Sequence, residues 1–200
     1  MKKAVAYANS DIPTARTLGT KHLTKNEIAL TKSEYSALKA YSGHTYIPIQ
    51  ARLRETDGKI DGSGTHDALI RNIDKAMSKS KLDENVMLHR GTTLEEFTSM
   101  LGRAPSAQEL TMAKGFTYVS YGYTSTSIGD PPAMSSKPVI IHMKARTGDH
   151  AMNLMRVSRY GDTEREILLG RGTVFKIDQV EEHDGRIHVN VHITEQANAY

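Results

Sequence analysis

Residues 160–170 read YGDTEREILLG, in which Glu164 and Glu166 are separated by one residue and lead into the apolar run 167–169. In an extended segment, positions i and i+2 point to the same side, so this spacing predicts two carboxylates that face the same way at the mouth of a strand. Two like charges placed there repel each other. The motif therefore indicates a chemical role for the pair, although exposed strand ends also carry glutamates without one.

The predicted strand at 165–170 belongs to a β-rich second half of the chain. Apolar and β-branched runs predict strands over 86–91, 118–127, 137–145, 165–170, 173–180 and 186–193. Asp184-Gly185 lies between the last two strands and is a hairpin turn signal. One helix is predicted over 105–114, with Ser106 as its N-cap.

The first half has helical periodicity. Apolar residues recur at helical spacing from Leu23 and Ile28 to Tyr41, with Thr31 or Ser33 as a cap and Gly43 as the end. Further helices are predicted over 46–55 and 65–80, separated by the loop 57–67. The last helix places Leu69, Ile70, Ile73 and Met77 on one face. Helices followed by strands, without regular βαβ alternation, predict an α+β domain.

The composition predicts one globular domain over residues 1–200, mainly helical over 1–80 and mainly β over 84–200. The chain has 38% hydrophobic residues and no cysteine, which excludes disulfides, thiol nucleophiles and cysteine-based metal sites. Polar residues Asn9, Ser10 and Asp11 interrupt any signal peptide, and no run approaches the roughly 20 apolar residues of a membrane helix. We therefore expect a cytoplasmic protein with no membrane partner.

The charge is unevenly distributed. Residues 1–80 carry 13 Lys and Arg against 8 Asp and Glu, whereas residues 81–200 carry 13 against 15. A basic half can attract nucleic acid or an acidic protein surface. Because the lysines are scattered and lack interleaved aromatic residues, a solvated helical face is the favoured interpretation.

Hydroxyl side chains interrupt one predicted strand. In GYTSTS (122–127), Ser125 and Ser127 share one strand face and Thr126 lies on the other. The hydroxyls would line a surface that normally seeks apolar packing. The alternative is structural, since β-propensity explains the threonine and a turn explains the serines.

A second polar motif is LHRG at 88–91, where Arg90 ends a strand beside Gly91. A guanidinium at a strand end suits bidentate phosphate binding, and the glycine lets a ligand approach the backbone. An ordinary surface arginine is the alternative interpretation.

These three motifs follow one another in a fixed order: Arg beside an apolar or aromatic residue, aromatic-x-Ser-Thr-Ser, then Glu-x-Glu entering an apolar strand. The order resembles the arginine-serine-glutamate clan of mono-ADP-ribosyltransferases, in particular the catalytic domains of binary actin-modifying toxins and related bacterial and phage enzymes. Segments 40–54 (AYSGHTYIPIQARLR) and 164–177 (EREILLGRGTVFKI) also resemble a Tyr-rich helical segment and a closing strand pair of that family. The likeness covers about residues 24–194.

The resemblance implies an ADP-ribosyltransferase-like fold of two packed, mainly antiparallel sheets with an N-terminal group of helices. It also implies NAD as co-substrate, cleaved between nicotinamide and ribose with positive charge developing on the ribose. Glu166 would stabilise that charge, Ser125 would position Glu166 and the ribose, and Arg90 would hold a phosphate. The implied cofactor-binding set is His89, Arg90, Gly91, Ser125, Thr126, Ser127 and Glu166.

The first acidic position of the motif implies the acceptor. In the family, glutamate there accompanies arginine acceptors and glutamine accompanies asparagine acceptors, so Glu164 implies transfer to an arginine of a target protein. A carboxylate can orient a guanidinium and help remove its proton. Tyr160 would help to recognise the target, although it lies four residues before Glu164 and three is more usual. The loop 128–138 would cover bound NAD.

Other functions remain open at this point. The protein could be an NAD glycohydrolase with water as acceptor, which would not require Glu164, or a non-catalytic nucleic-acid-binding module; an RNA acceptor is a weaker alternative. We expect no metal, because His188 and His192 lie about 13 Å apart along one strand. We also expect a monomer that acts as a toxin, an injected effector or a phage enzyme.

Overall fold

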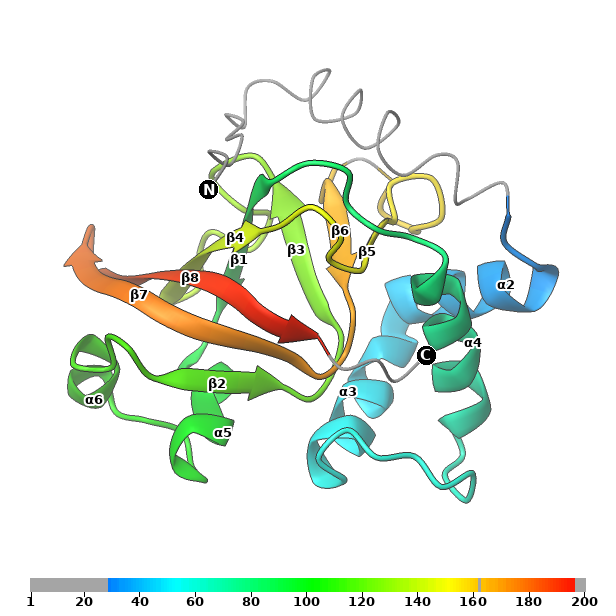
Figure 1. Ribbon diagram of the computed structural model, residues 1–200, viewed down its shortest axis with the longest axis horizontal. Coiled ribbons are helices and arrows are strands. Elements are labelled where there is room, and N and C mark those ends of the chain that lie inside the picture. The colour runs from blue at the N-terminus through cyan, green and yellow to red at the C-terminus, as the bar shows by residue number, and fades with distance from the viewer. Residues whose placement is uncertain (1–28, 162, 197–200) are drawn as a thin grey trace.

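The computed structural model describes residues 29–161 and 163–196, and its N-terminal part is helical (Figure 1). Helix α2 (Lys32–Ala40) begins with a capping box, in which Thr31 Oγ1 accepts from the Glu34 amide and the Glu34 carboxylate accepts from the Thr31 amide. This cap satisfies two amides that a helix start leaves unpaired. The prediction that Thr31 caps this helix is confirmed, whereas the predicted helical positions Leu23 and Ile28 lie outside the described residues.

Gly43 does not end the helical segment as predicted. It lies in a π-helical turn (Tyr41–Thr45) with non-helical φ and ψ of −97° and −137°, and the chain continues directly into α3 (Tyr46–Glu55). This non-helical residue produces a kink between two helices instead of a stop, and a Cβ added there would lie 3.3 Å from Arg159 Nε. The kink turns α3 away from α2 and leaves Tyr41 buried between them and the sheet.

Helix α4 (Asp67–Ser78) follows the predicted loop. Asp67, which is fully buried, organises this loop by accepting from the amides of Gly62 and Gly64 at 2.9 and 3.2 Å. The predicted apolar face of α4 is the one that packs inward, with Ile70, Ile73 and Met77 buried.

Eight strands form a single mixed sheet in the order β2-β7-β8-β4-β1-β3-β6-β5. They are β1 (Val86–Thr92), β2 (Thr117–Ser120), β3 (Thr124–Ile128), β4 (Val139–Ala145), β5 (Ala151–Asn153), β6 (Glu166–Leu169), β7 (Thr173–His183) and β8 (Arg186–Gln196). Neighbouring strands are antiparallel except β4 and β8, which are parallel. The α+β class is confirmed.

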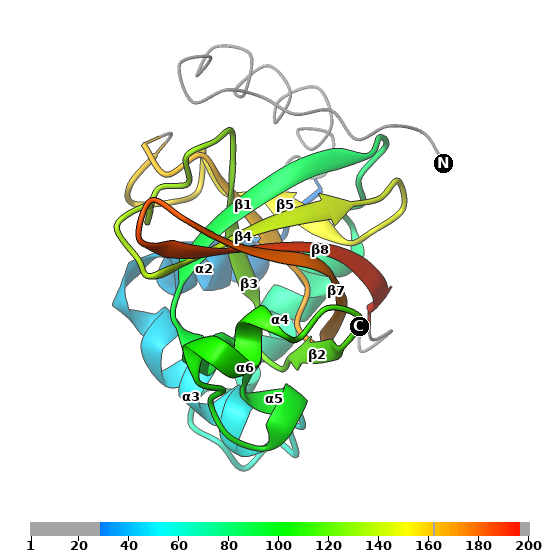
Figure 2. The ribbon, with the colours of Figure 1, turned by 90° about the vertical axis from the view of Figure 1, so that its left-hand side faces the viewer.

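The two predicted sheets are joined. Strands β1 and β3 pair only at Leu88 with Ile128 and at His89 with Ser127, and this short ladder links the β2-β7-β8-β4-β1 half to the β3-β6-β5 half. The halves twist apart on either side of it (Figure 2). The two packed, mainly antiparallel sheets that the resemblance implies are thus joined by two backbone pairings into one continuous hydrogen-bonded sheet.

The predicted strand 118–127 is in fact two strands. β2 pairs with β7, whereas β3 pairs with β1 and β6. The break falls at Gly122, where a Cβ would collide with the side-chain oxygen of Gln50 from α3. A close helix contact thus divides an apparently continuous β-pattern.

The predicted β7–β8 hairpin is present, and the helix predicted over 105–114 is present but shorter. Asp184 and Gly185 both have positive φ, 53° and 70°, as a tight β7–β8 hairpin requires. Ser106 caps α6 (Ala107–Thr111) through a capping box with Glu109. Three short elements were not predicted: η2 (Leu94–Phe97), α5 (Thr98–Leu101) and strand β5.

Two apolar clusters stabilise the fold. One lies in the β-sheet part of the fold and contains Leu88, Ile141, Phe175 and Val191 among others. The other lies between helices α2, α3 and α4 and the β3-β6-β5 half (Figure 1), and Tyr123, Met152 and Leu168 belong to it. Among the described residues, no helix is both long enough and apolar enough to span a bilayer.

Candidate active site

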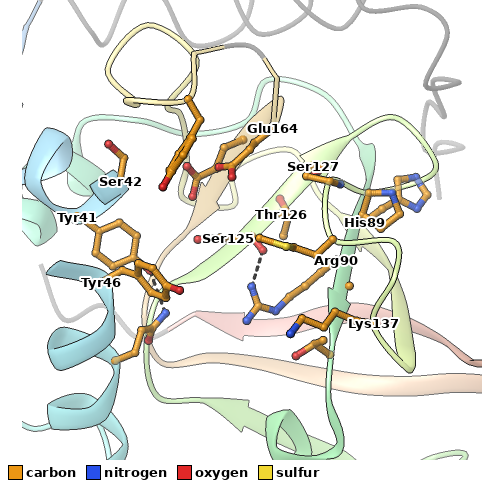
Figure 3. A pocket seen from close by; sticks show the side chains of 18 of the residues that line it. Tyr41, Ser42, Tyr46, His89, Arg90, Ser125, Thr126, Ser127, Lys137 and Glu164 are labelled. Carbon is orange, nitrogen blue, oxygen red and sulfur yellow. Dashed lines mark hydrogen bonds between the residues drawn. The ribbon is translucent and has the colours of Figure 1, made fainter. Parts of the chain in front are cut away.

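A pocket of about 540 Å³ opens between the helical layer and strands β1, β3 and β6 (Figure 3). The kinked segment around Tyr41 forms one wall, and the loop between β3 and β4 contributes Pro132, Ala133, Met134 and Lys137 to another. All residues predicted for the site line this pocket: His89, Arg90, Gly91, Ser125, Thr126, Ser127, Tyr160, Glu164 and Glu166. The three motifs, which are separated by 35 to 76 positions in the chain, therefore converge.

Glu166 is the first residue of β6 and lies opposite Ser127 of β3. Only 6% of it is exposed. Burial raises the pKa of Glu166 to about 7, and the nearby Glu164 adds to this, while a hydrogen bond from Ser125 and the charge of Arg90 oppose it. The pocket thus contains a carboxylate that is poised between its two protonation states at neutral pH.

The two glutamates are brought together by a backbone kink. Strand β6 starts at Glu166, and Arg165 has a φ of 48°, so residues 164–166 are not the extended segment that we predicted. A left-handed conformation is costly for a non-glycine residue. Glu164 is half-buried, and burial raises its pKa. Both glutamates nevertheless line the same pocket, with the left-handed residue Arg165 between them.

The Arg90 guanidinium is held in place by two contacts from the protein. Nη1 donates to the Ser125 carbonyl at 2.7 Å (Figure 3). Nη2 lies 3.2 Å from Glu96 Oε2. Nε is buried and has no partner among the described residues. A buried N–H group without a hydrogen-bond partner is destabilising. We interpret the Arg90 Nε as a donor that is available to an oxygen atom of a ligand.

The three hydroxyl residues of β3 have different surroundings. Thr126 Oγ1 donates to the Ile167 carbonyl at 2.6 Å and is tied to the neighbouring strand. Ser127 Oγ accepts from the Ala133 amide at 3.1 Å and so fastens the β3–β4 loop. Ser125 bonds to Glu166. Of the three, only Ser125 is therefore directed to a titratable group of the pocket.

Gly91 permits a close approach, but a protein group makes it. A Cβ at Gly91 would collide with the Met134 carbonyl of the β3–β4 loop. The loop therefore packs against the backbone of β1 at this point. We had predicted that the glycine makes room for a ligand, whereas the space above it is filled by Met134.

The structure adds residues that the motifs did not single out. The buried Tyr41 hydroxyl accepts from Gln50 Nε2 at 2.9 Å, and burial together with Glu166 raises its pKa above the ordinary range. Glu96 fixes Arg90 from a short helix. The resemblance points to the segment 40–54 by its tyrosines, but nothing in the pattern of that segment distinguishes the buried Tyr41 from Tyr46, which is 47% exposed.

The pocket has separate basic and acidic regions. Arg90 and Lys137 lie at one side and Glu164 at the other in Figure 3. Arg54 also lines the pocket. The arrangement suits an elongated ligand that carries phosphates at one end and a cationic group at the other. Tyr160, 51% exposed, lies at the rim.

Comparisons of the sequence with known proteins agree with this site. The family model for ADP-ribosyltransferase exoenzymes matches residues 15–198. A mono-ADP-ribosyltransferase C3 of Hathewaya limosa is 27% identical over 192 residues, which cover 88% of this chain and 75% of the relative. Its counterpart from Clostridium botulinum D phage is 29% identical over 194 residues, with the same coverage.

Solved structures share the fold. Plx2a, an ADP-ribosyltransferase toxin from Paenibacillus larvae, is 26% identical with a TM-score of 0.81, covering 97% of this chain and 100% of the toxin. BECa, an ADP-ribosylating component of a Clostridium perfringens binary enterotoxin, shows the same fold at 21% identity and a TM-score of 0.76, covering 96% of this chain and 50% of BECa. The expected resemblance to binary toxin components is confirmed. The chain belongs to the ADP-ribosyltransferase exoenzyme family.

Proposed function

We propose that this protein transfers ADP-ribose from NAD to an arginine side chain of a target protein. The observation that carries the proposal is that Glu164 lines the same pocket as Glu166, Ser125 and Arg90. A second carboxylate beside the first is the feature that an arginine acceptor requires and that water does not.

The pocket residues fit NAD. Its volume of about 540 Å³ lies within the range of small-ligand sites. Arg90, Arg54 and Lys137 supply cations for the pyrophosphate, and the unpartnered Nε of Arg90 offers an additional donor. When bound, NAD supplies a glycosidic bond to a cationic pyridinium, and the breaking of this bond leaves positive charge on the ribose.

Glu166 would stabilise that charge electrostatically. Its carboxylate is largely removed from water, so its interaction with a nearby cation is only weakly screened. With a pKa of about 7 it is partly protonated at neutral pH in the free protein. A cation placed beside it favours the ionised form. Ser125 holds its orientation by a hydrogen bond.

Glu164 would receive the acceptor. It is half-buried at the mouth of the pocket and is preceded by a loop that carries Tyr160. Tyr46 and Ile47, 47% and 56% exposed, add apolar surface to the pocket lining. A protein could rest on this rim and direct a guanidinium to Glu164, where the carboxylate would orient it and accept its proton.

The test separates transfer from hydrolysis in two isosteric variants. Purified protein is incubated with labelled NAD and an agmatine or polyarginine acceptor, and both labelled acceptor and free ADP-ribose are measured. Glu166→Gln should lower both products, by about 10²–10³. Glu164→Gln should lower arginine labelling much more than NAD hydrolysis, because water needs no orienting carboxylate.

Glu55→Gln is the matched control, since Glu55 is an exposed residue at the end of α3 and should leave both products unchanged. Equal loss of both products in Glu164→Gln would contradict the acceptor role. Wild-type protein that releases only free ADP-ribose with every arginine acceptor would point to an NAD glycohydrolase instead.

A further inference from the structure

A row of histidines runs across the sheet beside the pocket. His89 of β1 lies opposite His142 of β4 in the antiparallel ladder, and their Nδ1 atoms are 2.9 Å apart. On the far side of the His142 ring, Nε2 lies 3.0 Å from Nδ1 of His188 in β8. Adjacent strands thus bring together imidazoles that are 46 and 53 positions apart in the chain.

A carboxylate completes the group. Asp130 is the second residue of the β3–β4 loop, and one ligand atom from each of His89, Asp130 and His142 lies within 4.8 Å of the others. Within residues 29–161 and 163–196, this is the one set of three such side chains at this spacing. His89 is buried, His142 is half-buried and Asp130 is exposed, so the set has an open side toward solvent.

We propose that His89, Asp130 and His142 bind a divalent transition-metal ion of the zinc type. Two imidazoles and one carboxylate are ligands that zinc accepts in proteins, and they leave a fourth position for water. This proposal differs from the prediction made from the sequence, which was that the protein binds no metal. That expectation considered two histidines of one strand, whereas the proposed ligands come from two strands and a loop.

The distances suit an ion. Two nitrogen atoms that face each other at 2.9 Å must share a proton, because two lone pairs repel. A metal ion can take the place of that proton. Two zinc–nitrogen bonds of about 2.0–2.1 Å in a tetrahedral arrangement separate the nitrogens by about 3.4 Å, so the rings need to move apart by only a few tenths of an ångström.

The surroundings orient the ligands. His89 is buried and His142 is half-buried, and the Nδ1 atoms of the two rings face each other. Nε2 of His89 is buried without a hydrogen-bond partner among the described residues, so this ring is free to change tautomer. When Nδ1 of His142 binds the ion, its Nε2 carries the proton and donates to His188, which would orient the ring.

Binding would also connect the site to the pocket. Asp130 precedes Pro132, Ala133 and Met134, which line the pocket, and His89 precedes Arg90. An ion held by Asp130 and both histidines would therefore tie the start of the β3–β4 loop to β1 and β4. This places a metal-dependent anchor next to the segment expected to cover NAD.

The experiment measures metal binding directly, on protein from which any affinity tag has been removed. Zn²⁺ is titrated by calorimetry, and Co²⁺ by its visible absorption, which reports ligand geometry. The wild type should bind one equivalent of either ion, with an intense tetrahedral Co²⁺ band, and its melting temperature should rise with Zn²⁺. Asp130→Asn and His142→Ala should each weaken Zn²⁺ binding by about tenfold or more.

His192→Ala is the matched control. His192 lies on the same strand as His188 but bonds to Asp178 at 2.8 Å, away from the proposed ligands, so its replacement should leave binding unchanged. Because Asp130 is exposed, Asp130→Asn keeps the test valid even if His142→Ala does not fold. The proposal would be overturned if the wild type bound neither ion. It would also be overturned if Asp130→Asn and His142→Ala bound Zn²⁺ with the same affinity as the wild type.

Discussion

Two residues of one chemical type acquire different properties at this site through burial. Glu166 is 6% exposed at the start of a strand, whereas Glu164 is half-buried in the bend before it. The same carboxyl group therefore has a pKa of about 7 at position 166 and a smaller upward shift at position 164. Removal from water destabilises an anion most where solvent is most fully excluded. Such a difference suits one buried group that stabilises charge and one accessible group that meets an acceptor.

The raised pKa of Glu166 predicts a pH-dependent cost to folding. Between pH 4.5, the ordinary value, and about 7, the native state keeps a proton that the unfolded state releases, so the contribution of Glu166 to stability falls as pH rises through this window. The glutamine of Glu166→Gln does not titrate, so the stability of this variant lacks the decrease with pH. We expect the variant to gain about 2–3 kcal/mol relative to wild type between pH 5 and pH 8 in urea unfolding.

Glu109→Gln provides the control for this comparison. Its hydrogen bonds to Arg103 and Ser106 lower the pKa of Glu109 to about 2, below the window, so its difference from wild type should stay constant from pH 5 to pH 8. A Glu166→Gln variant whose stability follows the wild type at every pH would show that this carboxylate is not perturbed.

At the scale of elements, the β3–β4 loop is positioned by strand backbones. The Met134 carbonyl rests on Gly91 of β1, Ala133 bonds to Ser127 of β3, and Arg165 Nη2 donates to the Pro131 carbonyl at 2.9 Å. The residue between the two glutamates thus contacts the loop on the other side of the pocket. The loop and the Glu-x-Glu segment form one connected wall.

Gly91→Ala should displace this loop without unfolding the protein. The added Cβ meets a backbone carbonyl that cannot rotate away, so the loop must move and the pocket wall with it. We expect the KM for NAD to rise by about tenfold while the far-UV circular dichroism is unchanged, since a displaced positioning element of this kind can cost up to about 10²-fold.

Gly102→Ala distinguishes this effect from a general cost of replacing glycine. Gly102 has a φ of 72° but nothing within 4 Å of an added Cβ, so its replacement should lower stability and leave the KM for NAD unchanged. Equal KM values for the wild type and Gly91→Ala would contradict the role given to the loop contact.

Elements with strong local signals were the ones predicted well. Helix α3 has the predicted bounds, 46–55, and the caps Thr31 and Ser106 act as predicted, because capping and periodicity depend on neighbours in sequence. The strand break at Gly122 and the kink at Gly43 were missed. At both positions the neighbouring side chain comes from a residue far away in the sequence. The Gln50 side chain occupies the space beside Gly122, and Arg159 Nε would lie 3.3 Å from a Cβ added at Gly43.

At the scale of the whole molecule, a buried ion pair connects the helical layer to the sheet. Arg171, which follows β6, donates to Asp74 of α4 through Nη2 at 2.8 Å and Nε at 3.0 Å. Tyr123 donates to the same carboxylate at 2.6 Å, and Arg171 also donates to the Gly58 carbonyl. These contacts fasten α4 and the loop before it to the end of β6.

Arg171→Met should be strongly destabilising. It leaves the Asp74 carboxylate buried without its cation, and loss of one partner of a buried pair costs about 3–5 kcal/mol. Urea unfolding measures the change. Arg103→Met, which removes the exposed Arg103–Glu109 pair, should cost only a small fraction as much. Comparable losses in the two variants would show that the buried pair does not hold the layers together.

The sequence by itself determined the fold class, most helix and strand positions and the identity of the motif residues that line the pocket. The fold class and the element positions follow from side-chain periodicity and turn chemistry, which can be read between neighbours along the chain. The motif residues follow from the resemblance of three ordered motifs to a known family.

Only the tertiary structure decided that Tyr41 and Glu96 join the site, that Glu166 is more fully buried than Glu164, and that His89 and His142 meet beside Asp130. Burial and the contacts between strands are set by residues many positions apart, and no local pattern encodes the distance between them.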